Sequence, residues 1–177
     1  MPFSALLATT LDLRDRQAQA ERAAGDSLEA ILDRHLLAVE AAGDGDLLTS
    51  VLLLDDEGHH LLHGAAPSLP KSLCAAIHGQ EIGPGRGSCG TAAYLGHAVY
   101  VTDIETSPLW ADFRELARAH DLRACWSTPI DVAPGRVLGA FAIYHHAPRG
   151  PTVEELVSIR LIMSHVADAI VASRRAD

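Results

Sequence analysis

Apolar residues recur at helical spacing in the first quarter of the chain. Residues 11–24 are mostly strong helix formers with alternating charges, which predicts an exposed helical extension that ends near Gly25. Asp26 and Glu29 stand three positions apart, like the two members of a capping box, so a second helix is expected to begin around Asp26 and to end at residues 43–46. The apolar face of this second helix consists of Leu28, Ile31, Leu32, Leu36 and Val39.

A wide apolar surface predicts that the C-terminal segment is also helical. Thr152 and Glu155 have the spacing of a capping box at its start. Two apolar stripes then run side by side, with neighbouring members three or four residues apart: Leu156, Ile159, Met163, Val166 and Ile170 in one, and Val153, Val157 and Leu161 in the other. Either one stripe packs on a sheet while the other meets a partner helix, or both stripes are buried within one subunit.

Between these helices the pattern changes to short apolar runs separated by turn residues. Strands are expected at residues 49–55, 59–63, 97–101, 123–131 and 137–145. Short helices are expected at residues 69–78, 91–95 and 107–120, the last because a serine followed by proline is a good helix start. Because hairpins dominate and no βαβ series occurs, the predicted class is α+β with an antiparallel sheet.

Composition limits the possible partners and the cellular compartment. The chain has 177 residues, of which 48% are hydrophobic and 21% charged, enough for one domain with a buried core. A net charge of −9 argues against a nucleic-acid partner, since a basic surface would be needed to neutralise phosphates. Three sparse cysteines, an N-terminus without a basic segment and the lack of an apolar run near 20 residues favour a cytoplasmic protein that is not in a membrane.

A glycine-rich loop at residues 85–90 (GRGSCG) matches the residues of the dinucleotide-binding pattern G-x-G-x-x-G but not the structural context that this pattern requires. That pattern requires a buried strand immediately before it, and residues 79–84 (GQEIGP) are not one. A Rossmann site is therefore rejected. Two interpretations stay open: Ser88 caps a helix whose free N–H groups meet an anion, or the loop is a tight turn without a ligand.

The three cysteines are the strongest candidates for chemistry. Cys89 lies at the start of the helix that leaves the glycine loop, where the helix dipole lowers a thiol pKa. Strand alternation places Cys125 on the same face as Ser127 and opposite Trp126. Cys74 lies on the helix before the loop. Each cysteine can equally be a small buried hydrophobe, and spacing alone does not bring two of them together.

Two further groups of residues have the composition of possible sites, one aromatic and one rich in histidine. Trp110 and Phe113 stand three apart on one helical face in a chain with 5% aromatic residues, so they either line a small-molecule pocket or fill the core. The histidines at positions 59, 60 and 63 alternate between the faces of one strand and cannot converge on a metal, so no metal site is expected.

Several segments taken together resemble a GAF domain, in particular the GAF modules of bacterial sensor histidine kinases and cyclic-di-GMP enzymes. They are residues 50–55, 82–93, 101–104, 108–110, 122–130 and 139–144. The resemblance implies a central antiparallel sheet of about six strands. It also implies terminal helices on one face, often forming a dimer bundle, and a ligand cavity under the helices of the other face. We expect residues 1–25 to be an N-terminal helical extension and residues 26–175 the GAF domain.

The known GAF ligand classes leave the cofactor unidentified. The sequence contains no Asn, so the Asn-Lys-Phe-Asp-Glu pattern of cyclic-nucleotide-binding members is absent. None of the cysteines is followed by His, as in many bilin-attaching members. Haem would require an inward-facing His, and none can be assigned.

One enzymatic GAF subfamily, the free methionine-(R)-sulfoxide reductases, provides an alternative function. Its glycine loop ends in a cysteine as this one does at Cys89, and the resemblance would make Cys125 the attacking thiolate and Cys74 the third cysteine. The spacings to Cys89 are wider than expected, and residues 126–129 lack the acidic groups needed to hold an amino group.

The sequence therefore predicts a non-enzymatic sensory or regulatory module that binds a small ligand, relays a signal through a dimer of its terminal helices, or does both. A signalling protein is a possible partner. The alternatives are the reductase, with Cys125 and Cys89 catalytic, and a ligand-free dimerisation scaffold. The predicted pocket residues are Cys89, Tyr94, Trp110, Phe113, Cys125 and Ser127.

Overall fold

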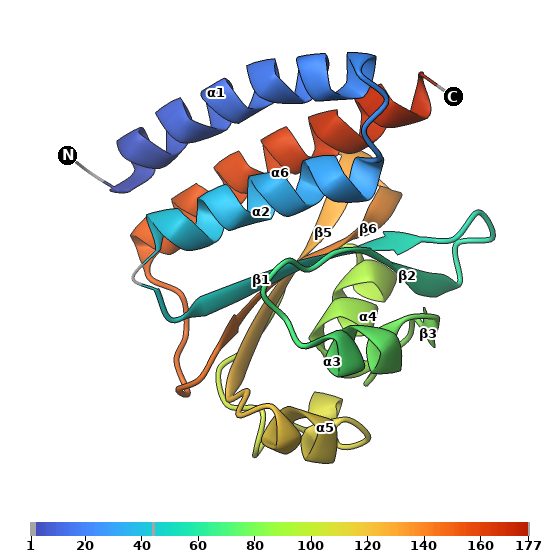
Figure 1. The fold of residues 1–177 in the computed structure, drawn as a ribbon. Helices are drawn as coiled ribbons and strands as arrows, with labels where there is room; N and C mark the ends of the chain where they lie inside the picture. The colour runs from blue at the N-terminus through green and yellow to red at the C-terminus, as the bar shows by residue number, and fades with distance from the viewer. Residues whose placement is uncertain (1–2, 44, 177) are drawn as a thin grey trace.

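A computed structural model describes residues 3–43 and 45–176 and contains one six-stranded antiparallel sheet (Figure 1). The strand order is β3-β2-β1-β6-β5-β4, with each neighbouring pair antiparallel. The strands are β1 (Leu47–Leu54), β2 (His60–Ala65), β3 (Gln80–Glu81), β4 (Val99–Val101), β5 (Ala124–Ala133) and β6 (Arg136–His145). The two predicted hairpins are β1–β2 and β5–β6. The two-residue edge strand β3 was not expected.

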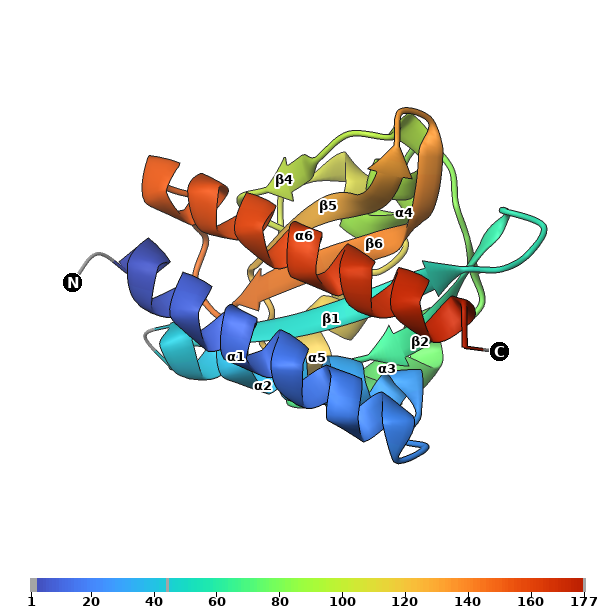
Figure 2. The same cartoon turned by 90° about the horizontal axis from the view of Figure 1, so that it is seen from above.

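Helices cover both faces of this sheet, which confirms the predicted α+β architecture. Figure 2, seen from above, shows the long helices lying across the strands, while Figure 1 shows the short ones on the opposite side. The long helices are α1 (Phe3–Ala23), α2 (Leu28–Ala42) and α6 (Val153–Arg174). The short ones are α3 (Lys71–Ile77), α4 (Gly87–Leu95), the 3-10 helix η1 (Pro108–Trp110) and α5 (Arg114–Ala119).

The sheet separates two apolar cores because its central strands are buried on both faces. Along β5 and β6, Trp126, Phe141 and Ile143 pack into the core beneath the long helices. Their neighbours Cys125 and Tyr144 belong to the core beneath the short helices. The period-2 alternation of a strand thus places adjacent residues in different cores.

Local signals set most helix boundaries, with three corrections. The predicted capping box of α6 is present, with Glu155 N 3.2 Å from Thr152 Oγ1. The predicted box at the start of α2 is wrong: Ser27 is the N-cap and accepts a hydrogen bond from the backbone N–H of Ala30. Asp26 instead forms an ion pair with Arg34 at 2.7 Å.

The other two corrections concern the short helices. Helix α4 begins at Gly87, four residues before the expected start, because the positive φ of 63° at Gly87 turns the glycine loop directly into the helix. The single helix expected over residues 107–120 is broken into η1 and α5, which are separated at residues 111–113.

Helix α1 is not the exposed extension that its charge pattern predicted. It begins earlier than residue 11, and Leu7, Leu11 and Ala18 are at most 2% exposed against α2 and α6. The division of the chain at residue 25 remains a prediction, and residues 1–2 of the predicted extension lie outside the described part.

Helix α6 buries most of its first apolar stripe and exposes the start of the second, whose last member, Leu161, is half-buried against the core. Ile159 and Ile170 are at most 3% exposed, whereas Val153 and Val157 are 80% and 51% exposed. Burial of both stripes within one subunit is therefore wrong. By length and composition α6 could cross a membrane, but a helix that packs on the core of its own domain passes the same test.

The burial of α1 makes a prediction about stability. Replacement of the buried Leu11 by Ala removes side-chain contacts from the core and should lower the free energy of unfolding by roughly 2–4 kcal/mol. The matched control is Leu37→Ala on α2, at a position that is 48% exposed, which should change it by less than about 0.5 kcal/mol. Urea denaturation measures both values. Equal, small effects would mean that α1 does not belong to the folded core.

Candidate functional site: a buried cysteine–serine cluster

Three of the predicted pocket residues meet between α4 and β5. Cys89 comes from the first turn of α4, and Cys125 and Ser127 come from one face of β5, as strand alternation predicted. The Ser127 hydroxyl lies 3.1 Å from Cys89 Sγ and 3.7 Å from Cys125 Sγ. Both cysteines are free thiols and are at most 7% exposed.

Trp110 joins this cluster through Ser88. The indole Nε1–H of Trp110 donates to Ser88 Oγ at 2.8 Å, and Ser88 Oγ donates to the carbonyl oxygen of Cys125 at 3.2 Å. Ser88 therefore does not cap α4, whose N-cap residue is Arg86, so the predicted serine cap is wrong. A continuous hydrogen-bonded path connects η1, α4 and β5.

The remaining predicted residues lie at different distances from the cluster. Phe113 is half-buried and packs edge-to-face on Trp110, with ring centroids 6.3 Å apart. Tyr94 is 55% exposed on the outer side of α4, so the structure does not bring it into the cluster. Cys74 is half-buried on α3 at the border of the same apolar core, and burial raises the pKa of its thiol.

Two cluster residues were not predicted. Tyr144 is paired with Cys125 across β5–β6, and its hydroxyl lies 3.3 Å from Ser50 Oγ on β1. Both side chains are at most 3% exposed. The alternation of β6 indicates which face Tyr144 occupies, but its position opposite Cys125 depends on a hairpin register that the sequence does not give.

The pKa values of the two thiols are shifted in opposite directions: hydrogen bonds lower that of Cys89, and burial raises that of Cys125. A hydrogen bond from Cys125 lowers the pKa of Cys89, aided by Ser127 and Tyr144 and opposed by burial. Burial raises the pKa of Cys125 well above its usual range, as does the neighbouring Cys89. Burial likewise raises the pKa of Tyr144. The pair is thus asymmetric, and Cys89 is the thiol that ionises first.

The glycine loop allows α4 to approach the edge of the sheet. A Cβ atom added to Gly90 would lie 2.8 Å from Arg86 Cβ and 3.0 Å from Gln80 Nε2. The same Gln80 amide donates to the carbonyl oxygen of Arg86 at 2.6 Å and so holds the loop. A larger residue at position 90 would displace the loop, and with it the first turn of α4 that carries Cys89.

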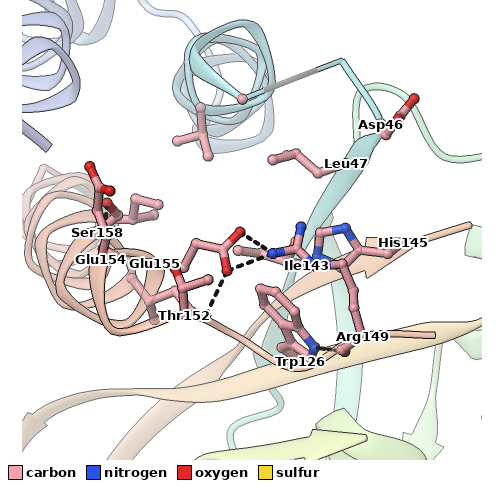
Figure 3. Close-up of a pocket in the computed structure, with 14 residues that line it drawn as sticks. Asp46, Leu47, Trp126, Ile143, His145, Arg149, Thr152, Glu154, Glu155 and Ser158 are labelled. Carbon is pink, nitrogen blue, oxygen red and sulfur yellow. Dashed lines mark hydrogen bonds and ion pairs between the residues drawn. The ribbon is translucent and has the colours of Figure 1, made fainter. Parts of the chain in front are cut away.

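A separate cavity of about 340 Å³ lies on the opposite face of the sheet, at the start of α6 (Figure 3). The resemblance implied a cavity under α4 and α5, where Cys89, Trp110, Cys125 and Ser127 are packed at 0–7% exposure. The cavity is lined instead by residues from α2, β1, β5, β6 and α6, including Trp126 and His145. Nothing in the sequence pattern indicated it.

These features define the chain as a single-sheet α+β domain with one helical layer on each face. The sequence profile of the GAF domain family matches residues 25–171. The chain therefore belongs to the GAF domain family.

A relative of known role is the methyl sulfide methyltransferase-associated sensor of Methanosarcina acetivorans. It is 42% identical over 140 residues, which cover 78% of this chain and 14% of that protein. The chain thus spans about one seventh of the length of this relative, and the homologous part belongs to a sensor.

Solved structures share the fold at low sequence identity. The free methionine-R-sulfoxide reductase of Neisseria meningitidis, in complex with its substrate, superposes with a TM-score of 0.72 at 19% identity, over 98% of this chain and 93% of that one. The GAF domain of a phosphoenolpyruvate-protein phosphotransferase from Coxiella burnetii has a TM-score of 0.71 at 20% identity, over 96% and 97%. At such identities the likeness establishes the fold alone.

His145 beside the cavity should make stability depend on pH. Burial lowers its pKa from 6.5 to about 4, so the unfolded chain takes up a proton at a higher pH than the folded one does. The folded state therefore loses up to about 3 kcal/mol as the pH falls from about 6.5 to about 4. His145→Gln should remove this part of the pH dependence, measured by urea unfolding at pH 7 and pH 4.5. His97→Gln at an exposed position is the control, and a loss as large in His145→Gln as in the wild type would contradict the assignment.

Proposed function

We propose that this chain is a non-enzymatic GAF sensory or regulatory module that binds a small ligand and relays the resulting change to a dimer interface of its long helices. The observation that supports this most directly is the alternation along β5. Cys125 and Ser127 face the cluster beneath the short helices, and Trp126 between them packs beneath the long helices. A shift of β5 on one side of the sheet therefore moves a large side chain on the other.

Trp126 is in direct contact with the segment that leads into α6. The centroid of its ring lies 4.3 Å from the centroid of the His145 ring and 5.0 Å from the guanidinium carbon of Arg149. Its Nε1–H donates to the carbonyl oxygen of Arg149 at 2.9 Å. Arg149 in turn pairs with Glu155 of the α6 capping box at 2.6 Å. The contacts from Ser127 to the first turn of α6 are thus continuous.

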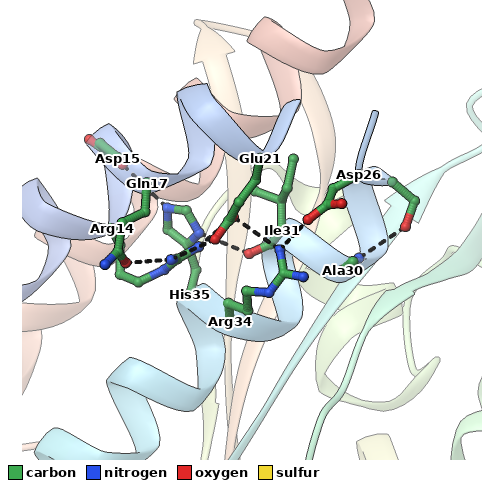
Figure 4. A network of polar contacts seen from close by, with 10 residues as sticks. Arg14, Asp15, Gln17, Glu21, Asp26, Ala30, Ile31, Arg34 and His35 are labelled. Carbon is green, nitrogen blue, oxygen red and sulfur yellow. Dashed lines mark hydrogen bonds and ion pairs between the residues drawn. The ribbon is translucent and has the colours of Figure 1, made fainter. Parts of the chain in front are cut away.

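Polar contacts tie the three long helices to one another, and Figure 4 shows those of α1 and α2. The guanidinium of Arg14, a residue only 9% exposed, pairs with Glu21 at 2.9 Å within α1. Asp15 of α1 lies 3.3 Å from His35 of α2 and 2.6 Å from His165 of α6. Because buried polar groups are stable only with their partners, these contacts fix the register of α1 on the other two helices. A displacement of one long helix should therefore move the other two.

The outer surface of this layer supports a homodimer. Val153 and Val157 of α6 are exposed, and Leu6 and Leu13 of α1 are each 54% exposed. The two helices run in the same direction, since Asp15 contacts His165 and Arg22 contacts Ser173. Their exposed apolar residues fit a bundle with a second copy of the chain. We place this dimer in the cytoplasm, with a signalling protein as its further partner.

Each of the two alternative functions has one observation in its favour. The reductase alternative is supported by structural likeness to two enzymes of that kind, but the resemblance would make Cys125 the attacking thiolate. In this chain Cys125 is 1% exposed, and burial raises its pKa, so it ionises after Cys89. The ligand-free scaffold is supported by the tight packing of the cluster.

The dimer is tested by placing a charge on the exposed stripe. Val157→Glu should convert a dimer to a monomer in sedimentation velocity, because an unpaired carboxylate in an apolar interface is costly. Leu37→Glu, at a position on α2 that is 48% exposed, is the matched control and should remain dimeric. A monomeric wild type, or a dimer insensitive to Val157→Glu, would contradict the proposed interface.

Ligand binding and catalysis are tested on the same preparation. Native mass spectrometry of the wild type should show a retained small molecule, and Trp110→Ala should lose it while the dimer persists. Loss of the folded state in Trp110→Ala, measured by thermal melting, would show that Trp110 is only a core residue. Turnover of free methionine sulfoxide with a thiol reductant would contradict a non-enzymatic role.

A further inference from the structure

The cavity at the start of α6 has the features of a small-molecule site of its own. Its volume of about 340 Å³ falls in the range of pockets that hold small ligands, roughly 300–1,000 Å³. Its apolar lining consists of Val39, Leu47, Trp126, Ile143, Ile159 and Ile162. The cavity lies on the face of the sheet opposite the cysteine–serine cluster. Ligand binding in the cavity can therefore be tested separately from ligand binding at the cluster.

The polar lining of the cavity carries an excess of negative charge. Asp46, Glu154 and Glu155 supply three carboxylates, and Arg149 supplies one guanidinium (Figure 3). Arg149 is bound to Glu155 through both carboxylate oxygens, at 2.6 and 2.8 Å, so that pair is neutral overall. The carboxylates of Asp46 and Glu154 remain, and among the lining residues they have no ion-pair partner.

His145 is the second observation that points to a ligand. It lines the cavity at 4% exposure, and within residues 3–43 and 45–176 its Nε2 has no hydrogen-bond partner. A buried polar group without a partner is unusual and costs free energy. Because burial lowers its pKa to about 4, the ring is neutral at physiological pH and adds no positive charge to the cavity. A neutral imidazole can accept a hydrogen bond from a cationic donor.

We propose that this cavity binds a small organic cation, a protonated amine on an apolar body. The apolar body would pack on Trp126 and the aliphatic lining, while the ammonium group would be held near the two free carboxylates and hydrogen-bonded to the His145 ring. Aromatic rings also attract cations, as the Arg149 guanidinium above Trp126 already shows. The same negative charge disfavours carboxylates and phosphates.

Occupancy of this cavity would act directly on α6. Its lining includes Thr152 and Glu155, the two members of the capping box, together with Ser158 one turn later. A ligand there would contact the first turn of the helix whose exposed stripe carries the proposed interface. The amine is therefore an effector of the helical layer, and it binds on the face of the sheet opposite the cysteines.

Calorimetric titration with 2-phenylethylamine, 2-phenylethanol and 3-phenylpropionate separates charge from shape, since the three share one apolar body. The wild type should bind the amine most tightly, the alcohol more weakly and the carboxylate least. Equal binding of all three, tighter binding of the carboxylate or no binding of the amine would overturn the proposal. The site of binding is read from Trp126, the single tryptophan left in Trp110→Phe, whose fluorescence should change on addition of the amine.

Two variants test the charge and the space separately. Glu154→Gln should weaken amine binding about threefold, and Asp46→Asn combined with it about tenfold, as expected for exposed charges. Glu57→Gln, at an exposed turn away from the cavity, is the matched control and should bind as the wild type does. Leu47→Trp should fill the cavity and abolish binding. Should Leu47→Trp fail to fold, the charge variants decide alone, and amine binding unchanged by them would refute the site.

Discussion

One sheet buried on both faces is the constraint on which the rest of this structure depends. An antiparallel sheet often leaves one face in water, but β1, β5 and β6 carry apolar residues on both faces, so each face requires its own helical cover. The long helices supply one cover and the short ones the other. Adjacent residues of β5 consequently belong to different cores, and the strand becomes the physical link between them.

Polar residues inside both layers add specificity to this apolar frame. Beneath the short helices, Ser127 is hydrogen-bonded to two thiols, and Ser88 connects Trp110 to β5. Within the long helices, Asp15 bridges two histidines. Such groups are stable only in one arrangement, so a change that breaks one contact favours a discrete shift of the elements it joins. This is the physical basis for treating the domain as a relay.

The type of most elements and the face of the strand on which a residue lies could be predicted from the sequence, whereas contacts between distant segments could not. The hairpins, the α6 capping box and the opposite orientations of Cys125 and Trp126 all follow from local patterns. The charges of α1 suggested exposure, yet Arg14 is buried because Glu21 pairs with it. The position of Tyr144 opposite Cys125 depends on strand register, and the cavity at the start of α6 depends on how the helices are placed on the sheet. Neither can be read from a short stretch of sequence.

Hydrogen exchange along α6 in Ser127→Ala, compared with the wild type, tests the proposed link through β5 most directly. Ser127 is fully buried beneath the short helices and has no contact with α6 among its described hydrogen bonds. The account predicts that the hydrogen-bonded amides at the start of α6, those of Glu155 and Leu156, lose protection by more than the change in global stability explains. Changes confined to α4, β4 and β5, with α6 unaffected, would contradict it.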